Sequence, residues 1–321
     1  MDKSTSLLKK TDDLEVISLM DNSVDFLSSI GRKDVFNIRE WCTREKTAKT
    51  MLKPIAEHGF STLIRLSSDD ATHNVLFDTG GSSNGVLKNV KMMRLDLSEV
   101  EAIVISHGHW DHFGGLKKIA STINKDNLPI IIHKDMLKIR GSIRSDGTIK
   151  MYPDFPREDE IKPARYIATK NPYSLCDNTV VVTGEIPRIT DFEKGYQQHR
   201  VFVEGEWKPD PYIWDDRALV IDVKKKGLVI ISGCAHAGII NTALYAKKIT
   251  DVSDVFAVIG GFHLAGKDNE ERVLKTINEL KDLDPKLIAP SHCTGWRGMC
   301  AIAKAFPQAF VWNSVGNRYR F

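Results

Sequence analysis

The hexapeptide His107-Gly108-His109-Trp110-Asp111-His112 places three imidazoles and one carboxylate within six positions. Only 10 of the 321 residues are histidine, so chance alone rarely produces such a cluster. The apolar run Ala102-Ile103-Val104-Ile105 before it is typical of a buried strand, and Phe113-Gly114-Gly115-Leu116-Lys117-Lys118-Ile119 after it indicates a turn and a helix start. A strand that delivers ligands to a loop, with more ligands at a following helix start, can bring them together on a metal ion.

The residue types in this hexapeptide suit a metal centre. Neutral imidazole nitrogens and carboxylate oxygens bind zinc, iron and manganese. His107 and His109 are two positions apart, so on an extended loop their side chains can point the same way. Asp111 and His112 follow at once and can face a second ion, and two ions about 3.5–4 Å apart can share one hydroxide. The alternative is a set of surface or core histidines, but packing four neighbouring titratable groups without a cation would be costly.

The composition is that of an ordinary soluble globular protein. Hydrophobic residues make up 42% of the chain and charged residues 27%, and the net charge of +3 is too small to indicate a nucleic-acid or membrane surface. The N-terminus lacks the apolar core of a signal peptide, and no run approaches the roughly 20 apolar residues of a membrane span. The five cysteines are scattered, so we predict a reduced, cytoplasmic location. A small-molecule substrate is the expected partner, and the oligomeric state is left open.

The first part of the chain alternates short apolar strands with helices. Strands are predicted at 15–19, 61–66, 74–77, 102–105 and 129–133, and helices at 46–58, 85–95 and 115–122. From about residue 134 to residue 215 prolines and aromatic residues become frequent and helical stripes fade. We interpret this segment as a loop-rich insertion that shapes the pocket, with an elaborated structural loop as the alternative.

The last part repeats a strand–helix rhythm. We predict a hairpin at 218–223 and 227–231, strands at 255–259, 286–289 and 310–311, and helices at 237–250, 269–281 and 298–305. Val273, Leu274, Ile277 and Leu280 are expected on the buried side of the helix at 269–281. Two halves of this kind fit an α/β (α+β) fold in which two sheets pack face to face with helices outside, within a single domain spanning residues 1–321.

Titratable residues follow each of the late strands. Cys234 and His236 follow the strand that ends at residue 231, His263 follows the strand at 255–259, and His292 follows the strand at 286–289. Strand ends on one edge of a sheet are where loops gather a site. We therefore predict His236 and His292 as metal ligands, whereas His263 can be a ligand, a general acid or a hydrogen-bond donor to substrate.

The pattern His-x-His-x-Asp-His after an apolar strand resembles that of the metallo-β-lactamase superfamily. Six further stretches are similar to one archaeal and bacterial branch, named after dihydropterin-methyl-ribofuranosylaminobenzene-phosphate synthase: His58-Gly59-Phe60-Ser61-Thr62-Leu63-Ile64, Val75-Leu76-Phe77-Asp78-Thr79-Gly80, Thr183-Gly184-Glu185-Ile186-Pro187-Arg188, Ser232-Gly233-Cys234-Ala235-His236-Ala237-Gly238, Gly260-Gly261-Phe262-His263-Leu264 and Ser291-His292-Cys293-Thr294-Gly295. The resemblance runs from about Leu14 to the C-terminus. It implies a four-layer αββα sandwich.

This chain departs from the common superfamily pattern at one position. That pattern has a metal-bridging Asp at the end of the strand before the late region, where this sequence reads Gly233-Cys234. Cys234 could bind as a thiolate, because a metal lowers its pKa. His236 could supply the ligand instead, and Asp215 or Asp216 lies near the place where many relatives carry a His. A dinuclear centre of two Zn²⁺ ions is favoured, with Fe or Mn as other metals and a mononuclear site as the alternative.

Further residues complete the predicted site. In relatives the Asp-Thr-Gly turn that begins at Asp78 supports the metal loop, and a carboxylate there can accept an imidazole N–H. Trp110 is predicted at the mouth of the site. Arg188 and Arg297 are candidates for contacts to an anionic group such as phosphate. Core or surface positions are the alternatives for these three residues.

These features predict a metal-dependent hydrolase. Bound metal would lower the pKa of water and supply a hydroxide, which Asp111 would orient, while His263 would assist the developing charge or leaving group. An ester, lactone or phosphodiester is the expected substrate, and the branch name implies a phosphorylated pterin or ribosyl precursor. The alternatives are a lactonase- or β-lactamase-like acyl hydrolase and a non-catalytic, metal-dependent binding protein, which Cys234 favours. The basic residues show no interleaved aromatic stripe, so a nuclease is not expected.

Overall fold

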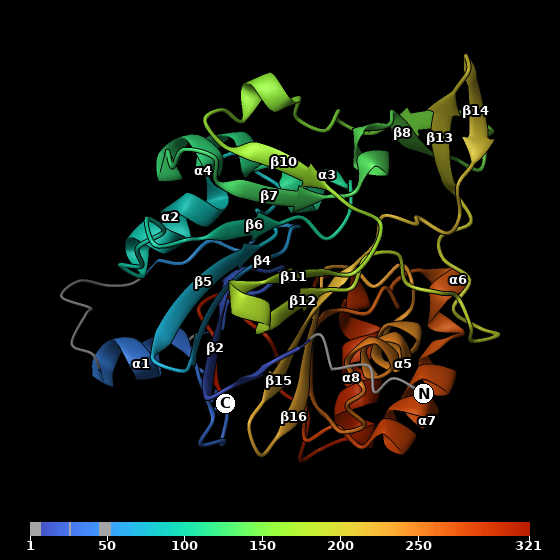
Figure 1. The fold of residues 1–321 in the computed structure, drawn as a ribbon. Coiled ribbons are helices and arrows are strands. Elements are labelled where there is room, and N and C mark those ends of the chain that lie inside the picture. The colour runs from blue at the N-terminus through green and yellow to red at the C-terminus, as the bar shows by residue number, and fades with distance from the viewer. Residues whose placement is uncertain (1–7, 26, 45–52) are drawn as a thin grey trace, which may run out of the picture.

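Two β-sheets lie face to face at the centre of the protein, and helices cover their outer faces (Figure 1). The computed structural model describes residues 8–25, 27–44 and 53–321. The eight-stranded sheet has the order β10-β7-β6-β5-β4-β2-β19-β3, and the seven-stranded sheet has the order β11-β12-β15-β16-β17-β18 with β1 beside β15. This arrangement confirms the predicted α/β class and the four-layer αββα sandwich.

The strands of the eight-stranded sheet are β2 (Asp13–Met20), β3 (Val35–Phe36), β4 (Ser61–Ser68), β5 (Ala71–Phe77), β6 (Ala102–Val104), β7 (Pro129–Ile132), β10 (Arg165–Ala168) and β19 (Arg318–Arg320). Those of the seven-stranded sheet are β1 (Lys10–Thr11), β11 (Tyr173–Leu175), β12 (Val180–Val182), β15 (Ala218–Val223), β16 (Gly227–Ser232), β17 (Val255–Gly261) and β18 (Leu287–Ser291). The helices are α1 (Ile38–Arg44), α2 (Gly85–Met92), α3 (Trp110–Phe113), α4 (Leu116–Ile123), α5 (Ile239–Thr250), α6 (Lys267–Glu270), α7 (Val273–Leu283) and α8 (Gly295–Ala305).

The alternation of side chains along the strands separates three apolar layers. In β16, Val229 and Ile231 point into the layer between the two sheets, whereas Leu228 and Ile230 point outward to α5, α7 and α8. In β5, Leu76 points outward to α2 and α4. Successive strand residues face opposite sides of a sheet, so both faces of each sheet are apolar and both must be covered. The buried layers therefore follow directly from the strand sequences.

Most predicted elements are present with shifted ends, but three differ. The predicted helix at 46–58 lies partly outside the described residues, and residues 53–58 are not helical. The predicted helix at 269–281 is two helices, α6 and α7. Leu274 is 73% exposed, because the buried face of α7 consists of Val273, Thr276, Ile277 and Leu280. Phe310 forms only an isolated bridge with Ile288. The last strand is instead β19, whose three residues are too few and too polar for a periodic signal.

The segment 134–215 is divided between the central sheets and a third sheet. Strands β10, β11 and β12 belong to the two central sheets. The third sheet has the order β14-β13-β8-β9 and consists of β8 (Arg140–Ile143), β9 (Ile149–Met151), β13 (His199–Val203) and β14 (Glu206–Pro209). Its β13–β14 hairpin stands away from the central sheets (Figure 1). This proline-rich segment was predicted to be loop-rich, yet it contains strands of the central sheets as well as those of the third sheet.

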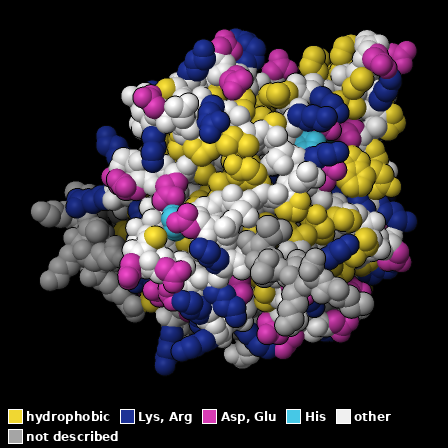
Figure 2. Space-filling view, in the orientation of Figure 1, with side chains coloured by type: hydrophobic (Ala, Val, Ile, Leu, Met, Phe, Trp, Pro, Cys, Tyr) yellow, Lys and Arg dark blue, Asp and Glu magenta, His cyan; other side chains and the backbone are white. Residues whose placement is uncertain are grey.

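The surface carries charges of both signs. On the face drawn in Figure 2, Lys and Arg side chains are interspersed with Asp and Glu, and hydrophobic side chains gather in patches in the upper half. Several exposed hydrophobic residues lie within the segment 134–215, among them Leu137, Met151, Ile189 and Phe202. Within the described parts of the chain, none of the helices has both the length and the apolar character needed to cross a bilayer.

Replacing Leu219 by alanine should lower the free energy of unfolding by about 2–5 kcal/mol, because its fully buried side chain fills the layer between the sheets. Leu274→Ala is the matched control and should change that free energy by less than about 0.5 kcal/mol, since Leu274 faces solvent. Chemical denaturation of both variants under identical conditions checks this. Equal losses in the two variants would contradict the assignment of the layers.

Candidate metal centre

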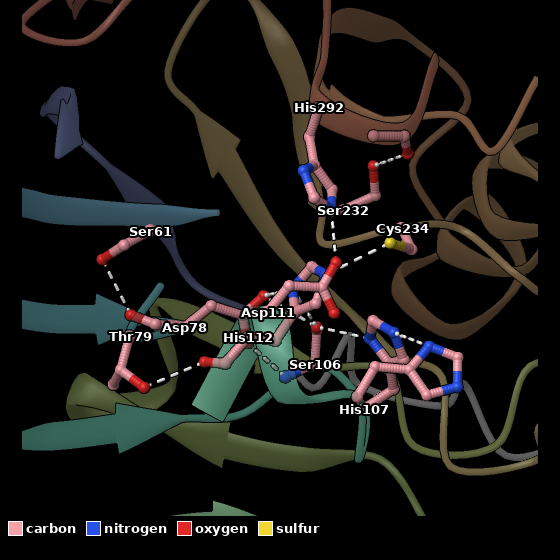
Figure 3. Close-up of polar contacts among 12 residues, drawn as sticks. Ser61, Asp78, Thr79, Ser106, His107, Asp111, His112, Ser232, Cys234 and His292 are labelled. Carbon is pink, nitrogen blue, oxygen red and sulfur yellow. Dashed lines mark hydrogen bonds and ion pairs between the residues drawn. The ribbon is translucent and has the colours of Figure 1, made fainter. Parts of the chain in front are cut away.

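The predicted ligands lie on loops at one edge of the two central sheets. The segment 107–112 follows β6 and runs into α3. Cys234 and His236 follow β16, His263 follows β17, and His292 follows β18. Because β16, β17 and β18 are parallel, their carboxyl ends lie side by side and their loops meet the loop after β6. Figure 3 shows Cys234 and His292 facing Asp111 and His112 from the C-terminal half of the chain.

His107, His109 and His236 form a three-histidine cluster in the interior. Nε2 of His107 lies 2.9 Å from Nδ1 of His109, and Nε2 of His236 lies 3.2 Å from the former and 3.1 Å from the latter. Ligands about 2.0–2.1 Å from a tetrahedral zinc ion stand roughly 3.3 Å apart. The three nitrogens therefore already have nearly the spacing of zinc ligands.

A second group, the Asp111 cluster, consists of Asp111, His58, His112 and His292. Oδ2 of Asp111 lies 3.1 Å from Nε2 of His292, 3.2 Å from Nε2 of His58 and 3.8 Å from Nε2 of His112. Asp111 and the two later histidines are buried, whereas His58 is exposed at the rim. His58 is absent from the ligands predicted above, although it begins one of the stretches that resemble the superfamily branch.

Cys234 lies between the two clusters. Its Sγ is 3.1 Å from Nε2 of His112. The same atom lies within 4.8 Å of ligand atoms of His107, His236 and His292. The thiol thus occupies the position between two sets of nitrogen and oxygen donors, where the superfamily pattern leads us to expect a bridging carboxylate.

Asp78 and Ser106 hold two of the histidines from behind. Oδ2 of Asp78 is 2.6 Å from Nδ1 of His112, and its two oxygens accept the backbone N–H and the hydroxyl of Ser106, each at 2.7 Å. The Ser106 hydroxyl oxygen is also 2.9 Å from Nδ1 of His107 (Figure 3). With their Nδ1 atoms engaged, both rings turn Nε2 toward the clusters.

Burial and charge set different protonation states in the two clusters. Burial lowers the pKa of each member of the three-histidine cluster well below its ordinary value, which favours the neutral form. Burial acts in the same direction on His112, but the Asp78 and Asp111 carboxylates outweigh it and raise the pKa of His112 to about 9. Burial would raise the pKa of Asp111, yet the imidazoles of His112 and His292 hold it well below its usual range.

His263 and Asp216 lie beside the clusters with unused polar atoms. The ring of His263 is 4.1 Å from that of His236, and both of its nitrogens are buried without a hydrogen-bond partner. Oδ2 of Asp216 accepts the backbone N–H of Ala237 at 2.9 Å, and Oδ1 has no hydrogen-bond partner. Burial raises the pKa of Asp216 to about 6.

The three predicted substrate contacts make other contacts within the protein. Trp110 is half-buried and packs against the apolar layer beneath α2 and α4. Arg188 donates to three backbone carbonyl groups in the segment 186–213. Arg297 is exposed and pairs with Glu270 at 2.8 Å. Contact of these side chains with a substrate stays a prediction.

Aromatic residues of the segment 134–215 lie against the clusters and were missed from the sequence. The rings of Tyr152 and His199 are each 5.2 Å from that of His109, and the ring of Tyr196 is 5.7 Å from that of His263. Nε2 of His199 is buried without a partner. These residues stand alone in irregular sequence, so no spacing signals their position.

A cavity of about 580 Å³ lies elsewhere, against β2, β4 and β5. Residues that line it include His73, Arg65 and Glu15. It contains none of the residues of the two clusters. The convergence of ligand atoms, rather than cavity size, identifies the site.

A family model described as the metallo-beta-lactamase superfamily matches residues 55–292. The chain is 31% identical over 299 residues to 7,8-dihydropterin-6-methyl-4-(beta-D-ribofuranosyl)-aminobenzene-5'-phosphate synthase of Methanocaldococcus jannaschii, a match that covers 92% of this chain and 100% of that protein. It is 32% identical over 270 residues to an uncharacterized protein of the same organism, covering 82% and 93% of the two chains.

Two crystal structures share the fold. The structure of Tm1679, described as a metal-dependent hydrolase of the beta-lactamase superfamily, has a TM-score of 0.72 and 24% identity over 95% of this chain and 98% of its own. That of the metallo-beta-lactamase fold protein YhfI from Bacillus subtilis has a TM-score of 0.51 and 12% identity over 97% of this chain and 100% of its own. On its sequence match and its fold, this chain belongs to the metallo-β-lactamase superfamily.

Proposed function

We propose that this protein is a hydrolase with two metal ions, one held by the three-histidine cluster and one by Asp111, His112 and His292, with Cys234 between them. The approach of three imidazole nitrogens to 2.9, 3.1 and 3.2 Å carries the proposal. A neutral imidazole has a single N–H, so three nitrogens that face one another cannot all be satisfied by mutual hydrogen bonds. A cation accepts all three lone pairs at once.

The residues around the clusters have distinct proposed roles. When bound, the ions would lower the pKa of a water molecule and supply hydroxide at neutral pH. Asp78 holds His112 in one orientation, and Asp111 is placed to orient the attacking oxygen. His263 has two unpaired ring nitrogens beside His236 and can hold a proton for the leaving group. The aromatic side chains of the segment 134–215 would restrict solvent access and shape the pocket.

The donor set favours zinc. Imidazole nitrogens dominate both clusters, and a thiol lies between them. Nitrogen and sulfur donors suit zinc, while manganese prefers sites richer in oxygen donors. Iron also binds imidazole and carboxylate, so it is the second candidate metal.

Two substrate classes are supported by different observations. The name of the M. jannaschii relative supports a phosphorylated pterin or ribosyl compound. Arg188 and Arg297, however, are engaged with other groups of the protein, and this favours an uncharged ester or lactone over a phosphate. We propose a phosphorylated pterin-type or ribosyl-type substrate first, because the match to that relative spans its whole length, and an uncharged ester or lactone second.

The purified protein should contain two equivalents of zinc by mass spectrometry, because two donor sets are present. His236→Ala should lose one equivalent of zinc, or bind it more than about 100-fold more weakly. Removal of a ligand lowers metal affinity more than removal of a residue that only supports a ligand. His73→Ala is the control, as His73 pairs with Glu101 outside the clusters, and it should keep both ions. Wild-type protein that stays free of transition metals after reconstitution would rule out the proposed centre.

Turnover should depend on the metal. Phosphodiester, lactone and β-lactam substrates, each assayed before chelation, after chelation and after zinc is restored, test the reaction class. Cleavage of one class that chelation abolishes and zinc restores is the expected outcome. A protein that keeps its zinc but cleaves no ester or phosphodiester would instead be a binding protein.

His263→Asn should separate two roles of this residue. If His263 handles a proton, the variant keeps both zinc equivalents and its kcat falls on the order of 10²–10⁴-fold. Asparagine tolerates the positive φ of 47° at this position better than most residues, so the backbone is preserved. Loss of a zinc equivalent would identify His263 as a ligand instead.

A further inference from the structure

A buried ion pair contacts the loop that carries His107 and His109. Asp215 precedes β15 and is fully buried. Its Oδ1 accepts a hydrogen bond from Nη2 of Arg140 at 2.7 Å, and its Oδ2 accepts one from Nη1 of Arg140 at 2.7 Å. Oδ2 also accepts the backbone N–H of Gly108 at 2.8 Å. Gly108 is the residue between the two histidines, so the ion pair holds their backbone directly.

The contact at Gly108 leaves no space for a side chain. A Cβ atom there would lie 2.8 Å from Nη1 of Arg140 and 2.9 Å from Cα of Met136. The guanidinium therefore packs against the loop as well as bonding to Asp215. The backbone N–H of Arg217 adds a second tie, because it donates to the carbonyl oxygen of Ser106 at 3.0 Å.

The ion pair joins all three sheets at one point. Arg140 lies on β8 of the third sheet, Asp215 leads into the seven-stranded sheet, and Gly108 follows β6 of the eight-stranded sheet. The adjoining Asp216 makes a similar contact with the other loop, since it accepts the N–H of Ala237, next to His236. Neighbouring carboxylates thus hold the backbones of both loops that form the three-histidine cluster.

Stability alone does not explain a charge pair at this depth. Arg140 is 3% exposed and Asp215 0%. The desolvation of a buried pair commonly cancels its attraction, so an apolar pair of similar size often stabilises a fold as well. Burial works against the ionised form of Asp215, but the Arg140 guanidinium outweighs it and holds the pKa of that carboxyl well below its usual range. What the pair adds is a two-point hydrogen bond of fixed direction, which holds the Asp215 carboxylate in place to accept the backbone N–H of Gly108.

We propose that Arg140 and Asp215 are positioning residues that fix the spacing of His107 and His109 for a metal ion, and that the third sheet acts on the centre through them. This inference rests on the proposed metal centre. Supporting hydrogen bonds of this kind change metal affinity because they set the orientation of the ligands before the ion arrives. Among the described residues, the hydrogen bond that ties the pair to the ligand loop is the one from the backbone N–H of Gly108.

The test compares metal binding in full-length variants. Asp215→Asn, Arg140→Met, Arg140→Lys and the double variant Arg140→Met/Asp215→Asn are stripped of metal and titrated with Zn²⁺ against a chromophoric chelator. The absorption spectrum with Co²⁺ reports ligand geometry. Leu219→Ala is the control for lost stability, and Lys208→Met, from the exposed Lys208–Glu204 pair of the third sheet, is the control for a lost ion pair.

We expect Asp215→Asn and Arg140→Met each to weaken Zn²⁺ binding on the order of 10–100-fold and to alter the Co²⁺ spectrum. Arg140→Lys keeps the positive charge but cannot form the two-point hydrogen bond of a guanidinium. Its Zn²⁺ affinity should lie between that of these two variants and that of the wild type. Both controls should bind as the wild type does. The double variant should lose less binding free energy for Zn²⁺ than the two single variants lose together, because the two residues act as a unit.

Zn²⁺ affinity within twofold of the wild type and an unchanged Co²⁺ spectrum, with only the free energy of unfolding reduced, would overturn the inference. If Arg140→Met does not fold, Arg140→Lys and Asp215→Asn decide by the same two readouts. Wild-type protein that binds no Zn²⁺ would overturn the proposed function and this inference with it. Wild-type binding with unaffected variants overturns only the inference.

Discussion

Three imidazole nitrogens face one another at 2.9 to 3.2 Å in the interior of this protein. Protonation of these rings is disfavoured, because burial lowers the pKa of each one. An arrangement of this kind is unfavourable unless a cation lies between the nitrogens. The fold must therefore hold the loops in place against their mutual repulsion, and much of the structure around the centre can be understood as meeting that requirement.

The two central sheets hold these loops in place through parallel strands and buried hydrogen bonds. The carboxyl ends of β16, β17 and β18 lie side by side, so three loops reach the same point without long connections. In the eight-stranded sheet, Ser106 and Asp78 follow β6 and β5 and fix the orientation of His107 and His112, respectively. The third sheet contributes the Arg140 side of a buried ion pair at the same place. Supports from all three sheets thus converge on one loop.

The superfamily fixes the architecture of this protein and leaves its chemistry to the site. One scaffold supports many reactions, so the substrate depends on the residues that line the site rather than on the sheets. Cys234 lies where a bridging carboxylate is usual, and a thiolate would be a softer donor with a single ligand atom. Three rings of the segment 134–215 lie beside the cluster histidines: those of Tyr152, Tyr196 and His199.

The sequence by itself determined most of the apolar strands outside the segment 134–215, the two-sheet layering and the hexapeptide 107–112 as a candidate metal motif, because alternation and short spacings are properties of neighbouring residues. It predicted His236 as a ligand, but not that its Nε2 would lie 3.2 Å from that of His107, 129 residues away. Nor did it reveal that Asp215 would accept a hydrogen bond from Gly108, 107 residues away. It also placed Leu274 on the buried side of its helix, where the structure exposes it. Such contacts depend on sheet register and on the packing of loops, and only the tertiary structure decides them, since no local periodicity encodes which strand ends will meet.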